Sequence, residues 1–186
     1  AHRLDYLRMF SALGLSTLII DYRGYGRSSG KASEAGTYLD ADAAWRHATQ
    51  TLGIPPRRIV LFGESLGGAV ATKLAADVRP GALILASTFT SIPDVGAEKY
   101  PLLPIRLLAR ISYDTASRLP DVTCPVLVIH SPEDEVVPFA HGRRLFDLAR
   151  SPKRFLAIDG GHNDGFVFGR EEWRQQLDGF IRQTVP

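Results

Sequence analysis

The sequence contains a single cysteine, no long apolar run and almost no excess of charge of either sign. One cysteine excludes an intramolecular disulfide. Because Cys124 lies at the start of an apolar run, we interpret it as a small buried hydrophobic side chain. No stretch approaches the roughly 20 apolar residues of a membrane-spanning helix, and no signal peptide opens the chain. The net charge of +2, without a clustered basic stripe, argues against a nucleic-acid partner.

The remaining composition is that of one folded domain, residues 1–186, with 45% hydrophobic and 23% charged residues. Apolar runs predict strands, and amphipathic segments predict helices between them. The strands are expected at 15–21, 59–62, 81–87, 125–130 and 153–158, and the helices at 2–13, 37–52, 68–76, 139–150 and 171–184. Thr37 is the expected N-cap of the second helix. This alternation predicts an α/β fold with a doubly wound, mainly parallel sheet and helices on both faces.

Residues 91–120 break the alternation, because four prolines surround a short helical pattern at 105–111. We expect a cap-like insertion here, since the segment follows the end of a predicted strand. Its apolar side chains could line an acyl pocket or pack on the body of the domain, and the sequence leaves both possibilities open. These side chains are Tyr100, Leu102, Leu103, Leu107 and Leu108.

The pattern Gly-x-Ser-x-Gly at residues 63–67 carries the strongest chemical signal, because it lies between a predicted strand and a predicted helix. A serine hydroxyl is a poor nucleophile until it is positioned and loses its proton. A tight strand-to-helix turn would hold Ser65 in strained geometry above the sheet edge, and Gly63 and Gly67 would suit the crowded turn. The helix behind Ser65 would offer free N–H groups to a developing oxyanion.

A base and an acid are expected where other parallel strands end, because ligand chemistry collects at the carboxyl edge of such sheets. His162 follows two glycines after the last predicted strand. Glu133, Asp134 and Glu135 follow the strand at 125–130, and the residues alone leave all three acids possible. The order serine, acid, histidine is that of hydrolases with this serine motif. His47, His130 and His141 are interpreted as structural or solvated.

Together, residues 63–68, 130–138 and 160–164 resemble the α/β-hydrolase superfamily, and the loop at 21–28 matches the loop after that fold's fourth strand. The chain looks most similar to the small abhydrolase-domain proteins, which include membrane-anchored serine hydrolases and protein depalmitoylases. The resemblance implies Ser65 as nucleophile, His162 as general base and acid, Asp134 as orienting carboxylate, and the Leu66 backbone N–H as an oxyanion donor. It implies no cofactor and no metal.

The implied reaction is cleavage of a carboxylic ester or thioester of a small-molecule or acylated substrate. A peptidase using the same residues, or a non-catalytic binding scaffold, are the alternatives. In the resembling family, a strand and a His-Gly-rich turn that supplies a second oxyanion donor precede the first helix. We therefore expect this chain to be a fragment, with a gap in its sheet or direct pairing of 15–21 with 59–62. Membrane association is expected only through an upstream segment. A cytoplasmic or membrane-associated location is favoured.

Overall fold

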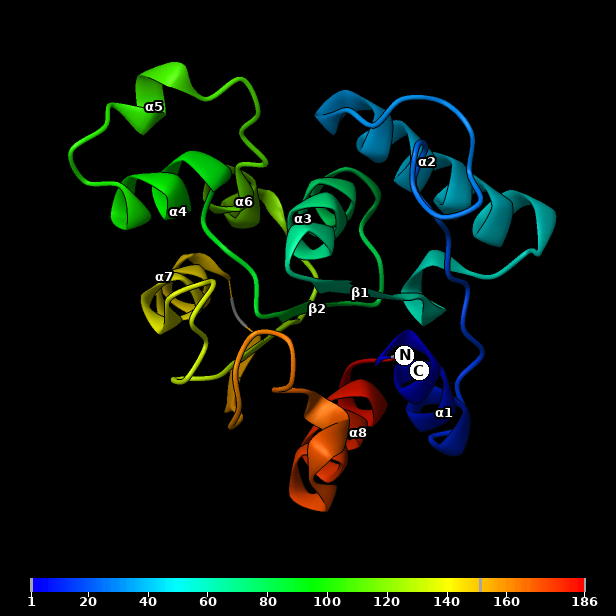
Figure 1. Ribbon diagram of the computed structural model, residues 1–186. Helices are drawn as coiled ribbons and strands as arrows, with labels where there is room; N and C mark the ends of the chain where they lie inside the picture. The colour runs from blue at the N-terminus through cyan, green and yellow to red at the C-terminus, as the bar shows by residue number, and fades with distance from the viewer. Residues whose placement is uncertain (1, 151, 186) are drawn as a thin grey trace.

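A computed structural model describes residues 2–150 and 152–185, and its centre is a four-stranded parallel sheet (Figure 1). The strands follow the chain in the order β1 (Val60–Glu64), β2 (Ala82–Ala86), β3 (Val126–His130) and β4 (Lys153–Ala157). Every residue of β2 and β3 is buried. This explains their unbroken apolar sequences, since both faces of a central parallel strand are covered. The predicted parallel α/β architecture is confirmed.

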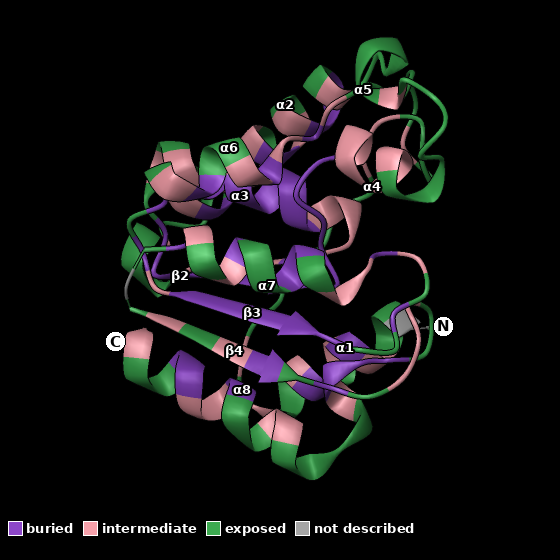
Figure 2. Cartoon of the chain, turned by 90° about the vertical axis from the view of Figure 1, so that its left-hand side faces the viewer, coloured by how far each residue is buried: buried purple, intermediate pink, exposed green. Residues whose placement is uncertain are grey.

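Helices cover both faces of the sheet (Figure 2). α1 (His2–Ala12) and α8 (Glu171–Thr184) pack on one face, against Ile84 and Ile129. α3 (Leu66–Val78) and α7 (Phe139–Leu148) pack on the other face, against the alternate strand side chains. The two cores thus follow from the period of two along each strand. None of the described helices combines the length and apolar character needed to cross a membrane.

The predicted strand at 15–21 is wrong. These residues form no strand and pair with none among the described residues, and Leu18, Ile19 and Ile20 are 52, 50 and 37% exposed. A β-strand is stabilised by hydrogen bonds to a neighbour, and an apolar sequence without a neighbour does not provide them. The expected direct pairing of 15–21 with β1 is therefore wrong, and the four described strands form a continuous sheet without this segment.

The second helix begins earlier than predicted. α2 (Glu34–Arg46) is capped by Ser33, whose hydroxyl accepts the Gly36 N–H, and it continues into a π-helical turn at His47–Thr51. Thr37 lies inside the first turn, where its hydroxyl donates to the Glu34 carbonyl, so its assignment as N-cap is wrong. Both residues suit a cap, but only Ser33 has the extended backbone that a cap requires.

The insertion at 91–120 leaves the carboxyl end of β2 and contains α4 (Ile92–Lys99), α5 (Ile105–Leu108) and α6 (Thr115–Arg118). The predicted helix at 105–111 is thus confirmed only over its first four residues. The Glu34 carboxylate accepts the N–H groups of Ser112 and Tyr113 and so ties the insertion to α2.

Five apolar side chains of the insertion do not pack on the body of the domain. Tyr100, Leu102, Leu103, Leu107 and Leu108 are 54 to 96% exposed. The packing alternative is therefore wrong for these five side chains. That they line an acyl pocket, and that the insertion caps a site, stay predictions.

Candidate active site

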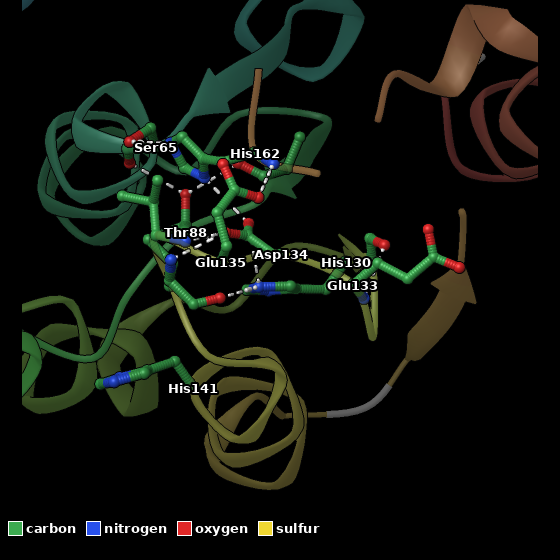
Figure 3. A network of polar contacts seen from close by, with 12 residues as sticks. Ser65, Thr88, His130, Glu133, Asp134, Glu135, His141 and His162 are labelled. Carbon is green, nitrogen blue, oxygen red and sulfur yellow. Dashed lines mark hydrogen bonds and ion pairs between the residues drawn. The ribbon is translucent and has the colours of Figure 1, made fainter. Parts of the chain in front are cut away.

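Ser65 lies in the tight turn between β1 and α3, at the carboxyl edge of the sheet (Figure 3). Its backbone has φ 51° and ψ −121°, a region that residues with a side chain rarely adopt. The turn is held on both sides, because the Ser65 N–H donates to the Ala86 carbonyl at 2.9 Å and the Ser65 carbonyl accepts the Gly68 N–H at 3.0 Å. The strained geometry predicted for this residue is confirmed.

Two glycines make room for this turn, and they are not quite the predicted pair. A Cβ at Gly63 would lie 2.4 Å from the Gly67 carbonyl oxygen, and one at Gly68 would lie 1.8 Å from Thr88 Oγ1. A Cβ at Gly67 would meet nothing closer than 4.0 Å. Steric crowding therefore explains Gly63 and Gly68, whereas the explanation offered for Gly67 is wrong.

Thr88 is a residue of this site that the sequence reasoning missed. Its hydroxyl lies 3.0 Å from the Ser65 carbonyl and 3.2 Å from the Ala86 carbonyl, so it bridges the ends of β1 and β2. Its position two residues past the end of a buried strand was the available signal. Leu66 is the first residue of α3, where backbone N–H groups have no intrahelical partner. Its N–H therefore lies at the positive end of the helix dipole.

The structure brings together three predicted residues that lie far apart in the sequence (Figure 3). His162 Nε2 lies 3.1 Å from Ser65 Oγ, and His162 Nδ1 lies 2.8 Å from Asp134 Oδ2. The Asp134 side chain is fully buried, and that of His162 is 12% exposed. The other carboxylate oxygen of Asp134 accepts the N–H groups of Val136 and Val137, which fixes the carboxylate in its loop.

The surroundings of Asp134 and His162 determine where their protons lie. Burial favours the neutral form of Asp134, but hydrogen bonds from His130, His162 and the Val137 N–H outweigh it and hold the pKa of Asp134 below its usual range. An ionised carboxylate only accepts, so in the neutral imidazole of His162 the proton lies on Nδ1, and Nε2 can accept one from Ser65. The same hydrogen bond, which His162 donates to Asp134, raises the pKa of His162, although burial opposes it.

The two neighbouring acids, Glu133 and Glu135, do not contact the imidazole ring in the same way. Glu135 Oε2 accepts the backbone N–H of His162 at 2.9 Å, and Glu133 Oε2 accepts the backbone N–H of Gly160 at 3.0 Å. Of the three acids left open by the residues alone, Asp134 is therefore the one that bonds to the ring of His162.

The other singled-out residues lie outside this chain of contacts. His130 is fully buried and its Nε2 donates to the Val137 carbonyl at 2.9 Å. His141 is buried beside Thr90, whose hydroxyl lies 2.8 Å from its Nδ1. His47 is exposed at the end of α2. Cys124 is buried, as predicted, and burial raises its pKa to about 11, so it is not a reactive thiolate.

The arrangement has the geometry to activate a hydroxyl. A hydroxyl, an imidazole and a buried carboxylate follow one another at hydrogen-bond distance, which is the geometry that removes a proton from a serine during attack. Among the described residues, no group of three or more His, Cys, Asp or Glu side chains is arranged to hold a metal ion.

The chain is similar to several known proteins. A family model described as serine aminopeptidase, S33, matches residues 4–115. An uncharacterized protein of Mycobacterium tuberculosis is 47% identical over 174 residues, which covers 93% of this chain and 62% of that protein. The human alpha/beta hydrolase domain-containing protein 17B is 33% identical over 186 residues, covering 97% of this chain and 61% of that protein. The chain thus spans about three fifths of the length of these relatives.

Solved structures show the same fold. An esterase of Pyrococcus furiosus matches with a TM-score of 0.80 over 98% of this chain and 75% of that structure. Its sequence identity is only 17%, so the likeness concerns the arrangement of the helices and strands. The esterase domain of a Rhodothermus marinus protein matches with a TM-score of 0.71 and 21% identity, over 98% of this chain and 80% of that structure.

Proposed function

Because the chain belongs to the S33 serine-aminopeptidase family of α/β hydrolases, we propose that it is a serine hydrolase that cleaves a carboxylic ester or thioester. The observation that carries the proposal is the unbroken contact from Ser65 Oγ to His162 Nε2 and from His162 Nδ1 to Asp134. Membership of the family agrees with the resemblance seen in the sequence. A fold by itself does not define a reaction, so the proposal depends on the contacts that join Ser65, His162 and Asp134.

In the proposed reaction, His162 Nε2 takes the Ser65 proton while Ser65 Oγ bonds to the substrate carbonyl carbon. The oxyanion accepts the Leu66 N–H at the start of α3. The bond to the leaving oxygen or sulfur then breaks, and Nε2 returns the proton to the leaving alcohol or thiol. Water attacks the acyl-enzyme, gives one proton to Nε2 and releases the carboxylic acid, and Nε2 restores the Ser65 hydroxyl. Asp134 stabilises the His162 imidazolium during both the formation and the hydrolysis of the acyl-enzyme.

The substrate class is proposed on two grounds. Esterases occur among the proteins that share the fold. The insertion that leaves the same sheet edge exposes Leu102, Leu103, Leu107 and Leu108, which suits an apolar acyl group better than a charged one. We place no metal and no cofactor in the reaction.

The test is the substitution Ser65→Ala, with Ser117→Ala on the exposed side of α6 as a matched control. The variant should lose hydrolysis of p-nitrophenyl butyrate and covalent labelling by a fluorophosphonate, because both need the Ser65 hydroxyl. The control should keep both. Hydrolysis and labelling that persist in Ser65→Ala would eliminate the assignment.

Cleavage of a peptide bond is the second candidate, favoured by the description of the matching family model as a serine aminopeptidase. The same three residues would act on an amide, and the leaving group would then be an amine. Comparing p-nitrophenyl butyrate with an aminoacyl p-nitroanilide separates the two. An anilide rate above the ester rate, lost in Ser65→Ala, would favour the peptidase. A non-catalytic scaffold predicts no labelling of Ser65.

A further inference from the structure

The histidine loop, residues 159–165, is held from outside by the loop that carries the acid. The two carboxylates beside Asp134 each accept one backbone N–H of the histidine loop, Glu133 from Gly160 at 3.0 Å and Glu135 from His162 at 2.9 Å. The three consecutive acids therefore all contact one short segment. The middle acid, Asp134, bonds to the ring of His162 (Figure 3). The outer two bond to main-chain N–H groups of the loop, Glu133 to that of Gly160 and Glu135 to that of His162.

The histidine loop is shaped to receive these carboxylates. Gly160 has φ +94°, and the Gly165 N–H donates to the Gly161 carbonyl at 2.7 Å, so the chain turns back on itself around His162. A Cβ at Gly161 would lie 2.5 Å from Glu135 Oε2. The glycine at 161 thus leaves the space through which the Glu135 carboxylate reaches the His162 N–H.

The acid loop is itself fixed, so it can act as a support. The Glu133 N–H donates to Ser131 Oγ at 3.0 Å, and Asp134 accepts two backbone N–H groups three residues or fewer along the chain. Hydrogen bonds that order a loop in this way reduce the freedom of the side chains it carries. Hydrogen bonds both to the His162 ring and to the main chain of the histidine loop would hold the imidazole in one orientation.

We propose that Glu133 and Glu135 are positioning residues that fix the main chain around His162 and so hold its ring against Ser65. The inference rests on the proposed function, since it assigns His162 the role of base. Both glutamates act through His162, and neither touches the reacting atoms. Small displacements of a catalytic group lower the rate steeply, so holding the ring in place affects turnover more than binding.

Glu135 also affects the charge at His162. The hydrogen bond to Asp134 raises the pKa of the His162 imidazole most, and the negative charges of Glu64 and Glu135 raise it further. Asp164 lies in the same loop, where its carboxylate faces the Gly161 position. Removing the Glu135 charge should therefore lower the pKa of His162, whichever side chain replaces it.

Two substitutions at Glu135 separate the hydrogen bond from the charge. Glu135→Gln keeps an oxygen that can accept the His162 N–H but removes the charge, and Glu135→Ala removes both. Glu133→Ala removes the bond to Gly160, and Glu172→Ala on the exposed surface of α8 is the matched control. The readouts are kcat, KM and the pH profile of kcat/KM for p-nitrophenyl butyrate, with thermal unfolding to verify the fold.

Glu135→Ala should lower kcat about tenfold with KM within about twofold, because a hydrogen bond to a charged group is lost. Glu133→Ala should also lower kcat, and the double variant should fall further. Glu135→Gln should retain most of kcat and move the acid limb of kcat/KM to lower pH. Glu172→Ala should match the unsubstituted protein.

The positioning role is overturned if both alanine variants stay within about twofold of the unsubstituted kcat. If Glu135→Ala does not fold, the kcat of Glu133→Ala decides. An acid limb that does not move in Glu135→Gln overturns only the effect of the Glu135 charge on His162. The two proposals fail differently. Activity in Ser65→Ala overturns the proposed function, whereas inactive Ser65→Ala with unaffected glutamate variants overturns only the positioning role.

Discussion

Replacing Asp134 by Asn changes the hydrogen bonds around the imidazole while keeping the size of the side chain. The amide oxygen can still accept the N–H groups of Val136 and Val137, now bonded at 3.0 and 2.7 Å. The amide NH₂ then takes the place of Oδ2, 2.8 Å from His162 Nδ1. Two donors cannot share that contact, so Nδ1 must give up its proton and accept.

The consequence reaches Ser65 through the ring. With Nδ1 unprotonated, the proton of a neutral imidazole lies on Nε2, which faces Ser65 Oγ at 3.1 Å. Nε2 can then no longer accept the serine proton. The corresponding change in the well-studied serine protease triad lowers kcat about 10⁴-fold, which is about 5 kcal/mol of transition-state stabilisation. We expect a loss of the same order here.

The assay is kcat/KM for p-nitrophenyl butyrate, together with the rate of fluorophosphonate labelling. Asp147→Asn, at an exposed position of α7, is the matched control and should keep full activity. Circular dichroism and thermal unfolding establish that Asp134→Asn is folded. A folded Asp134→Asn protein within about tenfold of the unsubstituted rate would refute the reasoning, because the base would then not depend on this tautomer.

Two further predictions concern stability. Gly63→Ala places a Cβ 2.4 Å from the Gly67 carbonyl oxygen and should lower the free energy of unfolding in urea by about 1–3 kcal/mol. Gly67→Ala, whose Cβ would meet nothing closer than 4.0 Å, should destabilise the fold less. Equal destabilisation by the two substitutions would contradict this account of the turn. Because the pKa of Asp134 is lowered in the folded protein, its ionised carboxylate stabilises the fold at pH values above the ordinary carboxyl pKa of about 4. That stabilisation is lost as the pH falls towards the folded-state pKa. The difference in urea midpoint between the unsubstituted protein and Asp134→Asn should therefore shrink on acidification. A difference that stays constant from neutral pH to pH 2 would show that the Asp134 charge does not stabilise the fold.

The parallel sheet could be predicted because its signal is local. Unbroken apolar runs in β2 and β3 are typical of strands covered on both sides, and their alternation with amphipathic helices leaves few other architectures. The same rule failed at residues 15–21, whose composition is equally strand-like. Pairing with a neighbour is a tertiary property, and here the apolar side chains of Leu18 and Ile19 lie half exposed.

The loops that carry the candidate site could be predicted from the sequence, because each follows a strand end and parallel strands end at one edge. Ser65 needed only the Gly-x-Ser-x-Gly turn between a strand and a helix. The sequence by itself thus determined the fold class, the position of the candidate nucleophile and the loops that could supply its partners.

Only the tertiary structure decided how the acids divide their roles. Glu133, Asp134 and Glu135 carry the same charge in consecutive positions, so composition and spacing cannot distinguish them. Their directions depend on the turn that Ser131 closes and on the space that Gly161 leaves open. The three carboxylates lie 2.8 to 3.0 Å from a ring nitrogen or a backbone nitrogen of the histidine loop only because the acid loop and the histidine loop are adjacent. The pairing of β3 with β4, the strands that these loops follow, places them side by side.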